Sequence, residues 1–204
     1  MPSLLEVFAV VTGIATVALA ARGHIANWPV GIASSAVFLV VFLEAGLYAD
    51  TLLQGLYVVL GFYGWWAWLF DGPKRTELPV SFAPNRLRAG LAVATVAGTL
   101  AFGAFLDLTT DSTVPYPDAA TTVLSLVAQL LLTRKHIDNW PVWIFGVNVP
   151  YIALYLYKGL ALTAVLQLVF IALSALGWRR WLRELHAGAV NADPPAARTL
   201  ETAA

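Results

Sequence analysis

The sequence predicts an all-α membrane protein with seven transmembrane helices, and three observations lead to this fold class. Hydrophobic residues make up 59% of the 204 residues and charged residues only 12%, whereas about 25% charged residues is typical of a soluble domain. Seven apolar stretches reach or approach the roughly 20 residues that cross a hydrocarbon core. A segment from the first part of the chain also recurs in the second part, which indicates an internal duplication.

The seven stretches are separated by short polar or Pro- and Gly-containing breaks. They cover residues 4–21, 28–47, 51–70, 87–106, 119–133, 140–157 and 160–182. The first carries Glu6 where a signal peptide would have a basic segment, so we interpret it as a retained span. We expect residues 1–183 to form a single transmembrane domain, and residues 184–204, which are small, polar and Pro-containing, to form a disordered cytoplasmic tail.

The duplication divides the chain into three parts. Residues 22–30 (RGHIANWPV) recur as residues 134–142 (RKHIDNWPV) at a shift of 112, and residues 64–69 (GWWAWL) recur as 177–182 (GWRRWL) at a shift of 113. The difference of one residue predicts an insertion inside the sixth span. We therefore expect two repeats of three helices, about 4–70 and 119–182, joined by a linker helix at about 87–106. A single linking span gives both repeats the same direction through the membrane.

The basic residues predict the orientation. Every Lys and Arg except Lys158 follows the first, third, fifth or seventh span, whereas Asp107, Asp111 and Asp118 collect on the side of Lys158. The positive-inside rule then places the N-terminus outside and the C-terminus in the cytoplasm of a bacterial inner membrane.

Several classes of function are not expected. Twelve basic residues balance twelve acidic ones, which offers no electrostatic case for nucleic acid, and the absence of cysteine removes thiolate chemistry. The chain has no Gly-rich phosphate-binding loop, and its three histidines lie in the predicted cytoplasmic segments, so we expect no ATP site, no metal centre, no cofactor and no enzyme. Acids are absent from the middle of the spans, so an ion-coupled pump is not expected either.

Polar groups at helical spacing identify the predicted interior of the bundle, because an amide that faces lipid lacks a hydrogen-bond partner. Such stripes contain Gln129 in the fifth span and Asn148 in the sixth, and the third and seventh spans each carry a glutamine followed by aromatic residues. The candidate substrate-binding residues are Gln54, Gln129, Asn139, Trp140, Asn148, Tyr151, Gln167 and Trp178.

Structural roles are the alternative for these residues. Trp178 equally fits an interfacial tryptophan belt, Ser125 fits helix packing, and the amides fit hydrogen bonds between helices. The first-repeat counterparts of Gln129 and Asn148 are Val17 and roughly Ala36, so we expect a site biased toward the fifth to seventh spans.

Several short motifs occur in a characteristic order, namely GLYA at 46–49, LLQ at 52–54, YGW at 63–65, LTRKHIDNW at 132–140, Asn148 and Lys158-Gly159. Together they resemble the PnuC family of nicotinamide riboside transporters. The resemblance covers about residues 4–183, with Ser34 where the family pattern has an asparagine. It implies a SWEET-like arrangement of two three-helix bundles, a homotrimer, and facilitated diffusion of a vitamin precursor for NAD biosynthesis, with trapping by a cytosolic kinase.

The expected cavity chemistry is neutral, because the candidate residues supply amides and aromatic faces but no cation for a phosphate. An uncharged ribose with a pyridinium ring fits this chemistry, and the resemblance favours nicotinamide riboside. Thiamine and riboflavin satisfy the same physical requirements, and a substrate-binding subunit of a larger importer is a further alternative.

Overall fold

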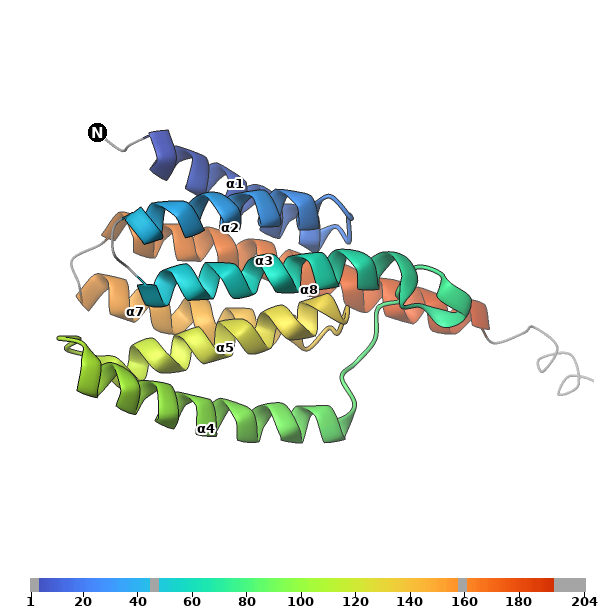
Figure 1. Cartoon of the computed structure of the whole chain (residues 1–204). Helices are drawn as coiled ribbons and strands as arrows, with labels where there is room; N and C mark the ends of the chain where they lie inside the picture. The colour runs from blue at the N-terminus through green and yellow to red at the C-terminus, as the bar shows by residue number, and fades with distance from the viewer. Residues whose placement is uncertain (1–3, 45–47, 158–160, 193–204) are drawn as a thin grey trace, which may run out of the picture.

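The computed structural model describes residues 4–44, 48–157 and 161–192, and these residues form seven long helical segments without a β-strand (Figure 1). The segments are α1 (Leu4–Ala21), α2 (Asn27–Glu44), α3 (Tyr48–Phe70), α4 (Asn85–Thr109), α5 (Pro115–Thr133), a continuous run of α6 (Asn139–Pro141), the π-helix η2 (Val142–Asn148) and α7 (Val149–Tyr157), and α8 (Ala161–Ala192). A short 3₁₀ turn, η1 (Pro73–Arg75), follows α3. The all-helical prediction is confirmed.

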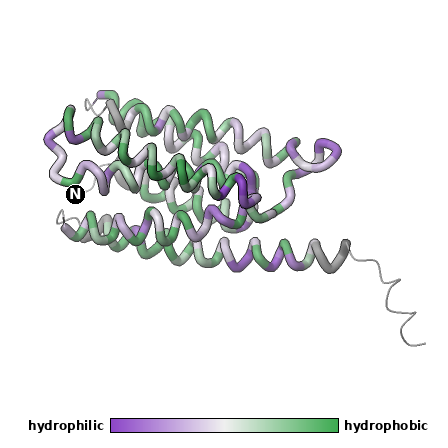
Figure 2. The backbone as a smooth tube through the Cα atoms, turned by 90° about the horizontal axis from the view of Figure 1, so that it is seen from below, coloured by the Kyte–Doolittle hydropathy of each residue, from purple (hydrophilic) through white to green (hydrophobic). Residues whose placement is uncertain are grey.

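Four of these helices are long and apolar enough to cross a membrane by themselves. They contain Asn27–Glu44, Thr51–Phe70, Asn85–Thr109 and Ala164–Gly188, and Val10–Ala21 is a shorter apolar helix. Hydrophobic residues run along the middle of the helices, while hydrophilic residues gather at the loops and at the far end of α8 (Figure 2). The sixth predicted span does not form one long α-helix because the π-helical segment divides it.

The end of the last helix differs from the sequence expectation. The predicted span ended at residue 182, but α8 continues to Ala192, so the first nine residues assigned to the tail, 184–192, are helical. Residues 193–204, the remainder of the predicted tail, lie outside the described residues.

Six of the helical segments form a closed ring. α1 packs against α2, α2 against α3, α3 against α5, α5 against η2, and both η2 and α7 against α8, which returns to α1. Helix α4 packs against α5 and lies at the edge of the bundle, outside this ring (Figure 1).

A cluster of four buried tryptophans, here called the tryptophan core, lies at one end of the ring. Its members are Trp28, Trp68, Trp140 and Trp181, which are at most 3% exposed. Trp28 meets Trp68 edge-on at 5.3 Å between ring centroids, Trp140 meets Trp181 edge-on at 5.2 Å, and Trp68 and Trp181 lie 5.8 Å apart. Edge-to-face pairs at these separations stabilise a core beyond the area that they bury.

Two glycines, in the repeated motifs at 64–69 and 177–182, allow this packing. The ring of Trp28 lies directly against Gly64 of α3, and a Cβ atom at Gly177 of α8 would lie only 2.6 Å from Cζ2 of Trp140. Any larger residue at either position would have to displace an indole ring. The same contact therefore brings α2 close to α3 and α6 close to α8.

We expect Gly64→Ala and Gly177→Ala to destabilise the protein by about 1–3 kcal/mol each, because overpacking forces the indole out of its position. Gly90→Ala in α4 is the control, since nothing lies within 4 Å of a Cβ atom there. Thermal unfolding of the purified protein in detergent measures the difference. Equal unfolding temperatures for Gly64→Ala and Gly90→Ala would contradict this account of the tryptophan core.

Candidate functional site

The ring of helices encloses a cavity of about 400 Å³, a size typical of small-molecule sites. Every segment of the ring contributes to its wall. The polar lining residues are Thr16, Asn27, Ser34, Ser35, Gln54, Tyr57, Ser125, Gln129, Asn148, Tyr151, Gln167 and Ser174. The large aromatic residues among the others are Trp28, Phe38, Trp140, Trp143 and Phe170. Trp28 and Trp140 also belong to the tryptophan core, which therefore forms one end of the cavity.

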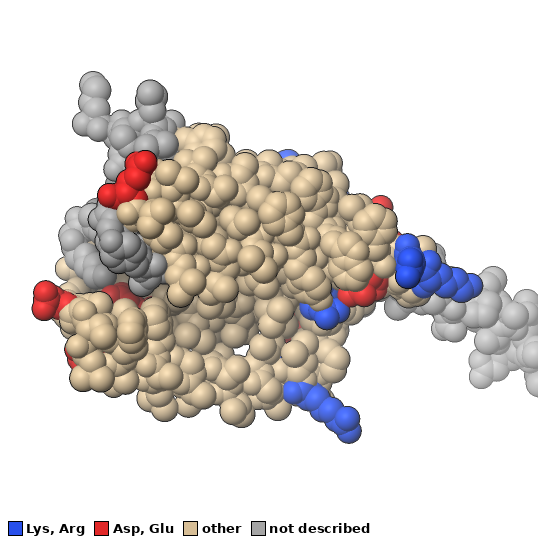
Figure 3. All heavy atoms as spheres, in the orientation of Figure 1, with Lys and Arg blue, Asp and Glu red and all other residues tan. Residues whose placement is uncertain are grey.

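The cavity wall is electrically neutral. Among the residues that the structure describes, no Lys, Arg, His, Asp or Glu lines it. On the visible surface, most Asp and Glu lie at one end of the bundle and Lys and Arg at the other (Figure 3). An anionic group such as a phosphate would lose its hydration in this cavity without gaining a cationic partner.

Four side-chain amides on the cavity wall have unused hydrogen-bonding capacity. Gln54, Gln129, Asn148 and Gln167 make no side-chain hydrogen bond to any described residue. Asn148 and Gln167 are only 5% and 7% exposed. Leaving a buried amide without a partner costs about 1–3 kcal/mol, so these groups require water or a polar ligand. Each amide can both donate and accept, which suits hydroxyl groups.

The structure brings six of the eight candidate residues together at this cavity. They are Gln54, Gln129, Trp140, Asn148, Tyr151 and Gln167. Trp178 instead packs, partly buried, against the tryptophan core. Asn139 is fully buried at the start of α6, where its Nδ2 donates to the carbonyl of His136 at 2.6 Å. Asn139 therefore stabilises the turn before α6.

Comparisons with known proteins show which family the chain belongs to. A family profile described as nicotinamide mononucleotide transporter matches residues 3–183. The chain belongs to this family.

Several relatives and a solved structure share the family. The nicotinamide riboside transporter PnuC of Escherichia coli is 26% identical and covers 88% of this chain and 85% of its own length. The riboflavin/roseoflavin transporter RibM of Streptomyces davaonensis is 29% identical over 84% of this chain and 81% of its own. The crystal structure of the vitamin B3 transporter PnuC matches with a TM-score of 0.70 and 26% identity, covering 90% of this chain and 82% of that one. The predicted resemblance is confirmed, and the chain is a multi-pass membrane protein.

For this member of the transporter family, the expectation of a cavity biased toward the second repeat needs correction. Ser34, Ser35 and Phe38 of α2 line the cavity, whereas Ala36 is exposed. Ser35 therefore occupies the place in α2 that Asn148 occupies in the second repeat. Sequence alignment pointed to Ala36 because it applied the shift of 112 beyond the insertion. Helices that precede α4 in the sequence and helices that follow it thus both supply polar groups to the wall.

Sequence analysis also left Tyr57 and Ser125 out of the candidate set. The Tyr57 hydroxyl donates to Oγ of Ser125 at 2.8 Å, and this Oγ donates to the carbonyl of Thr122 at 2.8 Å. The chain of bonds joins α3 to α5 across the cavity wall. Both residues lie on polar stripes, but spacing alone does not show which stripe residues meet.

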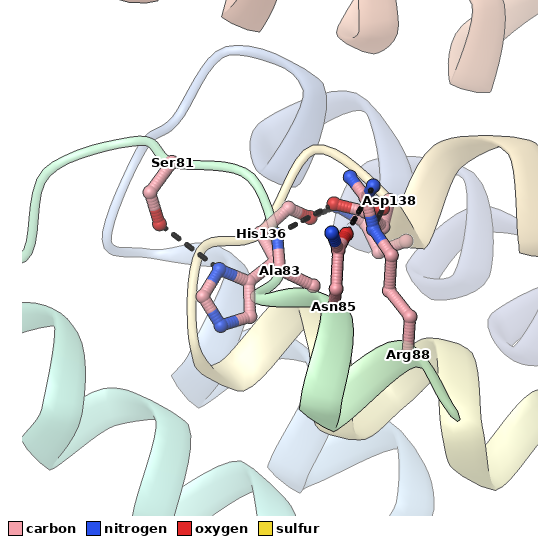
Figure 4. A network of polar contacts seen from close by, with 7 residues as sticks. Ser81, Ala83, Asn85, Arg88, His136 and Asp138 are labelled. Atoms are coloured by element: carbon pink, nitrogen blue, oxygen red, sulfur yellow. Dashed lines mark hydrogen bonds and ion pairs between the residues drawn. The ribbon is translucent and has the colours of Figure 1, made fainter. Parts of the chain in front are cut away.

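A set of contacts between two connecting segments, here called the clasp, involves Ser81, Ala83, Arg88, His136 and Asp138 (Figure 4). Asp138 accepts hydrogen bonds from the Ala83 N–H at 2.8 Å and from Nε of Arg88 at 2.7 Å. Oγ of Ser81 lies 2.9 Å from Nδ1 of His136. Backbone hydrogen bonds from the Ser81 N–H to the Lys135 carbonyl and from the Ile137 N–H to the Ser81 carbonyl join the same two loop segments. The connection from α3 to α4 is thereby fastened to the loop between α5 and α6. The equivalent loop of the first repeat has Ala26 in place of Asp138 and lacks this carboxylate.

Burial lowers the pKa of His136 below its ordinary value of 6.5, and the cations Arg134 and Arg88 act in the same direction, whereas Asp138 and Ser81 oppose the shift. Between the lowered value and 6.5 the folded chain binds fewer protons than the unfolded chain. Stability is therefore lost as the pH falls through this window.

We expect the unfolding temperature in detergent to decrease between about pH 7.5 and pH 5, because acid favours the unfolded, protonated His136. His136→Gln should flatten this pH dependence. His24→Gln, at the equivalent position of the first repeat, is the control and should keep the wild-type slope. An identical slope in His136→Gln and the wild type would show that His136 does not couple pH to stability.

Proposed function

We propose that this protein carries nicotinamide riboside across the inner membrane by facilitated diffusion, with the ligand held in the cavity between the two repeats. The observation that carries the proposal is the neutral wall with four unpaired amides. The relatives from Escherichia coli and Neisseria mucosa, the latter 30% identical, are named nicotinamide riboside transporters.

The wall favours the riboside over the mononucleotide for which the family profile is named. A phosphate carries close to two negative charges at neutral pH and is bound in proteins by Arg, Lys or helix N-termini. No cation lines the cavity among the described residues, so the phosphate would lose its hydration without compensation. The ribose hydroxyls instead match the amides of Gln129, Asn148 and Gln167.

The aromatic wall suits the cationic pyridinium ring. Trp140, Trp143 and Tyr151 line the cavity close to the amides along one helical run. A desolvated cation over an indole or phenol face gains up to about 2 kcal/mol. Trp178, which we predicted as a further platform, lies outside the lining, and Trp140 is only 1% exposed, so Trp143 is the better candidate.

Riboflavin is the second candidate substrate, because the relative RibM is named a riboflavin transporter. A flavin would stack on the same aromatic residues and its ribityl hydroxyls would use the same amides. The flavin lacks the positive charge of the pyridinium ring. Binding that depends on the ligand's charge therefore distinguishes the two.

Among the described residues no carboxylate or histidine lines the cavity, which also supports an uncoupled mechanism, because proton and ion relays normally use buried carboxylates or histidines. Net uptake would then depend on phosphorylation of the riboside in the cytosol, which traps it. Flux in liposomes that follows an imposed proton or sodium gradient would contradict this mechanism.

We further propose seven spans in a 3+1+3 arrangement within residues 1–183, a homotrimer, and the N-terminus outside. The ring with α4 outside it supports a linker helix between two repeats. Lys74→Cys and Asp111→Cys test the orientation in this cysteine-free chain. A membrane-impermeant thiol reagent should label Cys only at position 111 in intact cells, and labelling at position 74 instead would reverse the topology.

We expect Gln129→Ala and Asn148→Ala to weaken binding of nicotinamide riboside by about five- to thirtyfold each, since each removes a hydrogen-bonding partner worth about 1–2 kcal/mol. Isothermal titration calorimetry on the purified protein measures this. Val93→Ala is the control, because Val93 is 70% exposed on the outer face of α4.

The same titration compares the ligands. Nicotinamide riboside should bind more tightly than riboflavin, thiamine and nicotinamide mononucleotide. Tighter binding of any of these three would overturn the substrate assignment, and unchanged affinity in both alanine variants would overturn the site.

A further inference from the structure

The sixth helical run contains a π-helical segment that its counterpart lacks. Within η2, hydrogen bonds reach one residue further than in an α-helix, and the N–H of Val149 donates to the carbonyl of Ile144, five residues back. In the first repeat, α2 is an uninterrupted α-helix from Asn27 to Glu44. Short π-helical insertions of this kind concentrate at functional sites.

The cavity-lining residues indicate that the π-helical segment accommodates one residue more than the matching part of α2. Gly31 and Trp143 are equivalent at the repeat shift of 112, whereas Ser35 and Asn148 are equivalent at 113. One extra residue therefore lies between Trp143 and Asn148. In a regular α-helix an extra residue rotates everything beyond it by about 100°. The wider turn absorbs the residue, so Asn148 remains on the cavity face.

The helical hydrogen bonding is also weakened immediately after this segment. Pro150 has no N–H, so it cannot donate to the carbonyl four or five residues before it. The N–H of Val149 already bonds to Ile144, which leaves the Phe145 carbonyl without the donor that a regular helix would provide. Proline and π-helical turns are the usual causes of helix bending, and both occur here.

The two sides of the weakened segment are held differently. On one side, Asn139 and Trp140 are at most 1% exposed, and Trp140 is pressed onto Gly177 in the tryptophan core. On the other side, no residue of α7 is buried. Tyr151 and Tyr155 stack on each other along α7 at 5.3 Å, and Tyr151 lines the cavity. A fully buried start of the helix thus adjoins a half-helix that packs against α8 without burying any residue completely.

We propose that the π-helical segment is a hinge about which α7 swings relative to the fixed tryptophan core, moving Tyr151 toward and away from the cavity. This proposal rests on the proposed transport function. Because the first repeat has no such segment in α2, the motion is specific to the second repeat. The hinge lies at Val142–Asn148, between the tryptophan core and α7, and Trp143 and Asn148 of this segment line the cavity themselves.

Deletion of Phe145 tests the hinge without removing a lining residue, since Phe145 is 65% exposed and lies outside the cavity wall. The deletion restores the spacing of α2, so a regular α-helix can form with Asn148 still facing the cavity. We expect affinity for nicotinamide riboside to change by less than about threefold and transport into liposomes to fall by at least about tenfold, because binding is retained and the motion is lost.

Deletion of Ala33 is the matched control, because it is exposed at the equivalent position of α2. Helix α2 contains no extra residue, so this deletion should rotate Ser35 and Phe38 away from the cavity wall and abolish binding of nicotinamide riboside. Wild-type transport after deletion of Phe145 would overturn the hinge. Lost binding in a folded Phe145 deletion would contradict the register argument and overturn it equally.

A distance measurement without ligand tests the hinge independently of the substrate assignment. Spin labels at Leu156 of α7 and Leu176 of α8, which are 58% and 59% exposed, report their separation by electron paramagnetic resonance. The wild type should give a broad or double distance distribution, and the Phe145 deletion or Pro150→Ala a narrower one. Pro150→Ala provides the test if the deletion does not fold. Equally narrow distributions in the wild type and Pro150→Ala would refute the hinge even if nicotinamide riboside binds.

Discussion

The rest of the structure depends on one kind of contact, the packing of an indole ring onto a glycine, which occurs twice. Trp28 lies on Gly64 and Trp140 lies on Gly177, and the two pairs meet through Trp68 and Trp181. The core draws the helices together at one end of the ring and forms one end of the cavity. Because membrane helices gain little from apolar burial, close packing at small residues is the interaction available to hold them.

The chemistry of the cavity follows from the exclusion of polar side chains from the lipid-facing side of the helices. Amides on these helices would be unsatisfied against lipid, and they face the interior of the ring instead. The described charged residues stay outside the cavity wall, where Asp138, Arg88 and His136 build the clasp around a connecting loop. The wall is left polar but neutral, which matches an uncharged sugar attached to an aromatic ring better than a phosphate.

Helical spacing was sufficient to predict Gln129, Asn148 and Gln167 on the wall, and the changed repeat shift predicted the insertion that η2 contains. Helical spacing did not predict the place of Asn139 correctly. Its amide donates to the His136 carbonyl, a contact that the sequence motif does not reveal. The true counterpart of Asn148, Ser35, was missed because periodicity cannot locate an insertion within a helix. The clasp joins residues 50 to 55 positions apart, mostly in irregular loops, where no pattern predicts contact.

The central claim is that nicotinamide riboside occupies the cavity between the two repeats. An experimental structure of the protein with this ligand tests the claim most directly. The account predicts ligand density within hydrogen-bonding distance of the amides of Gln129, Asn148 and Gln167, with the pyridinium ring against Trp143. Density at a different place, or these amides bonded to one another around an empty cavity under saturating ligand, would contradict it.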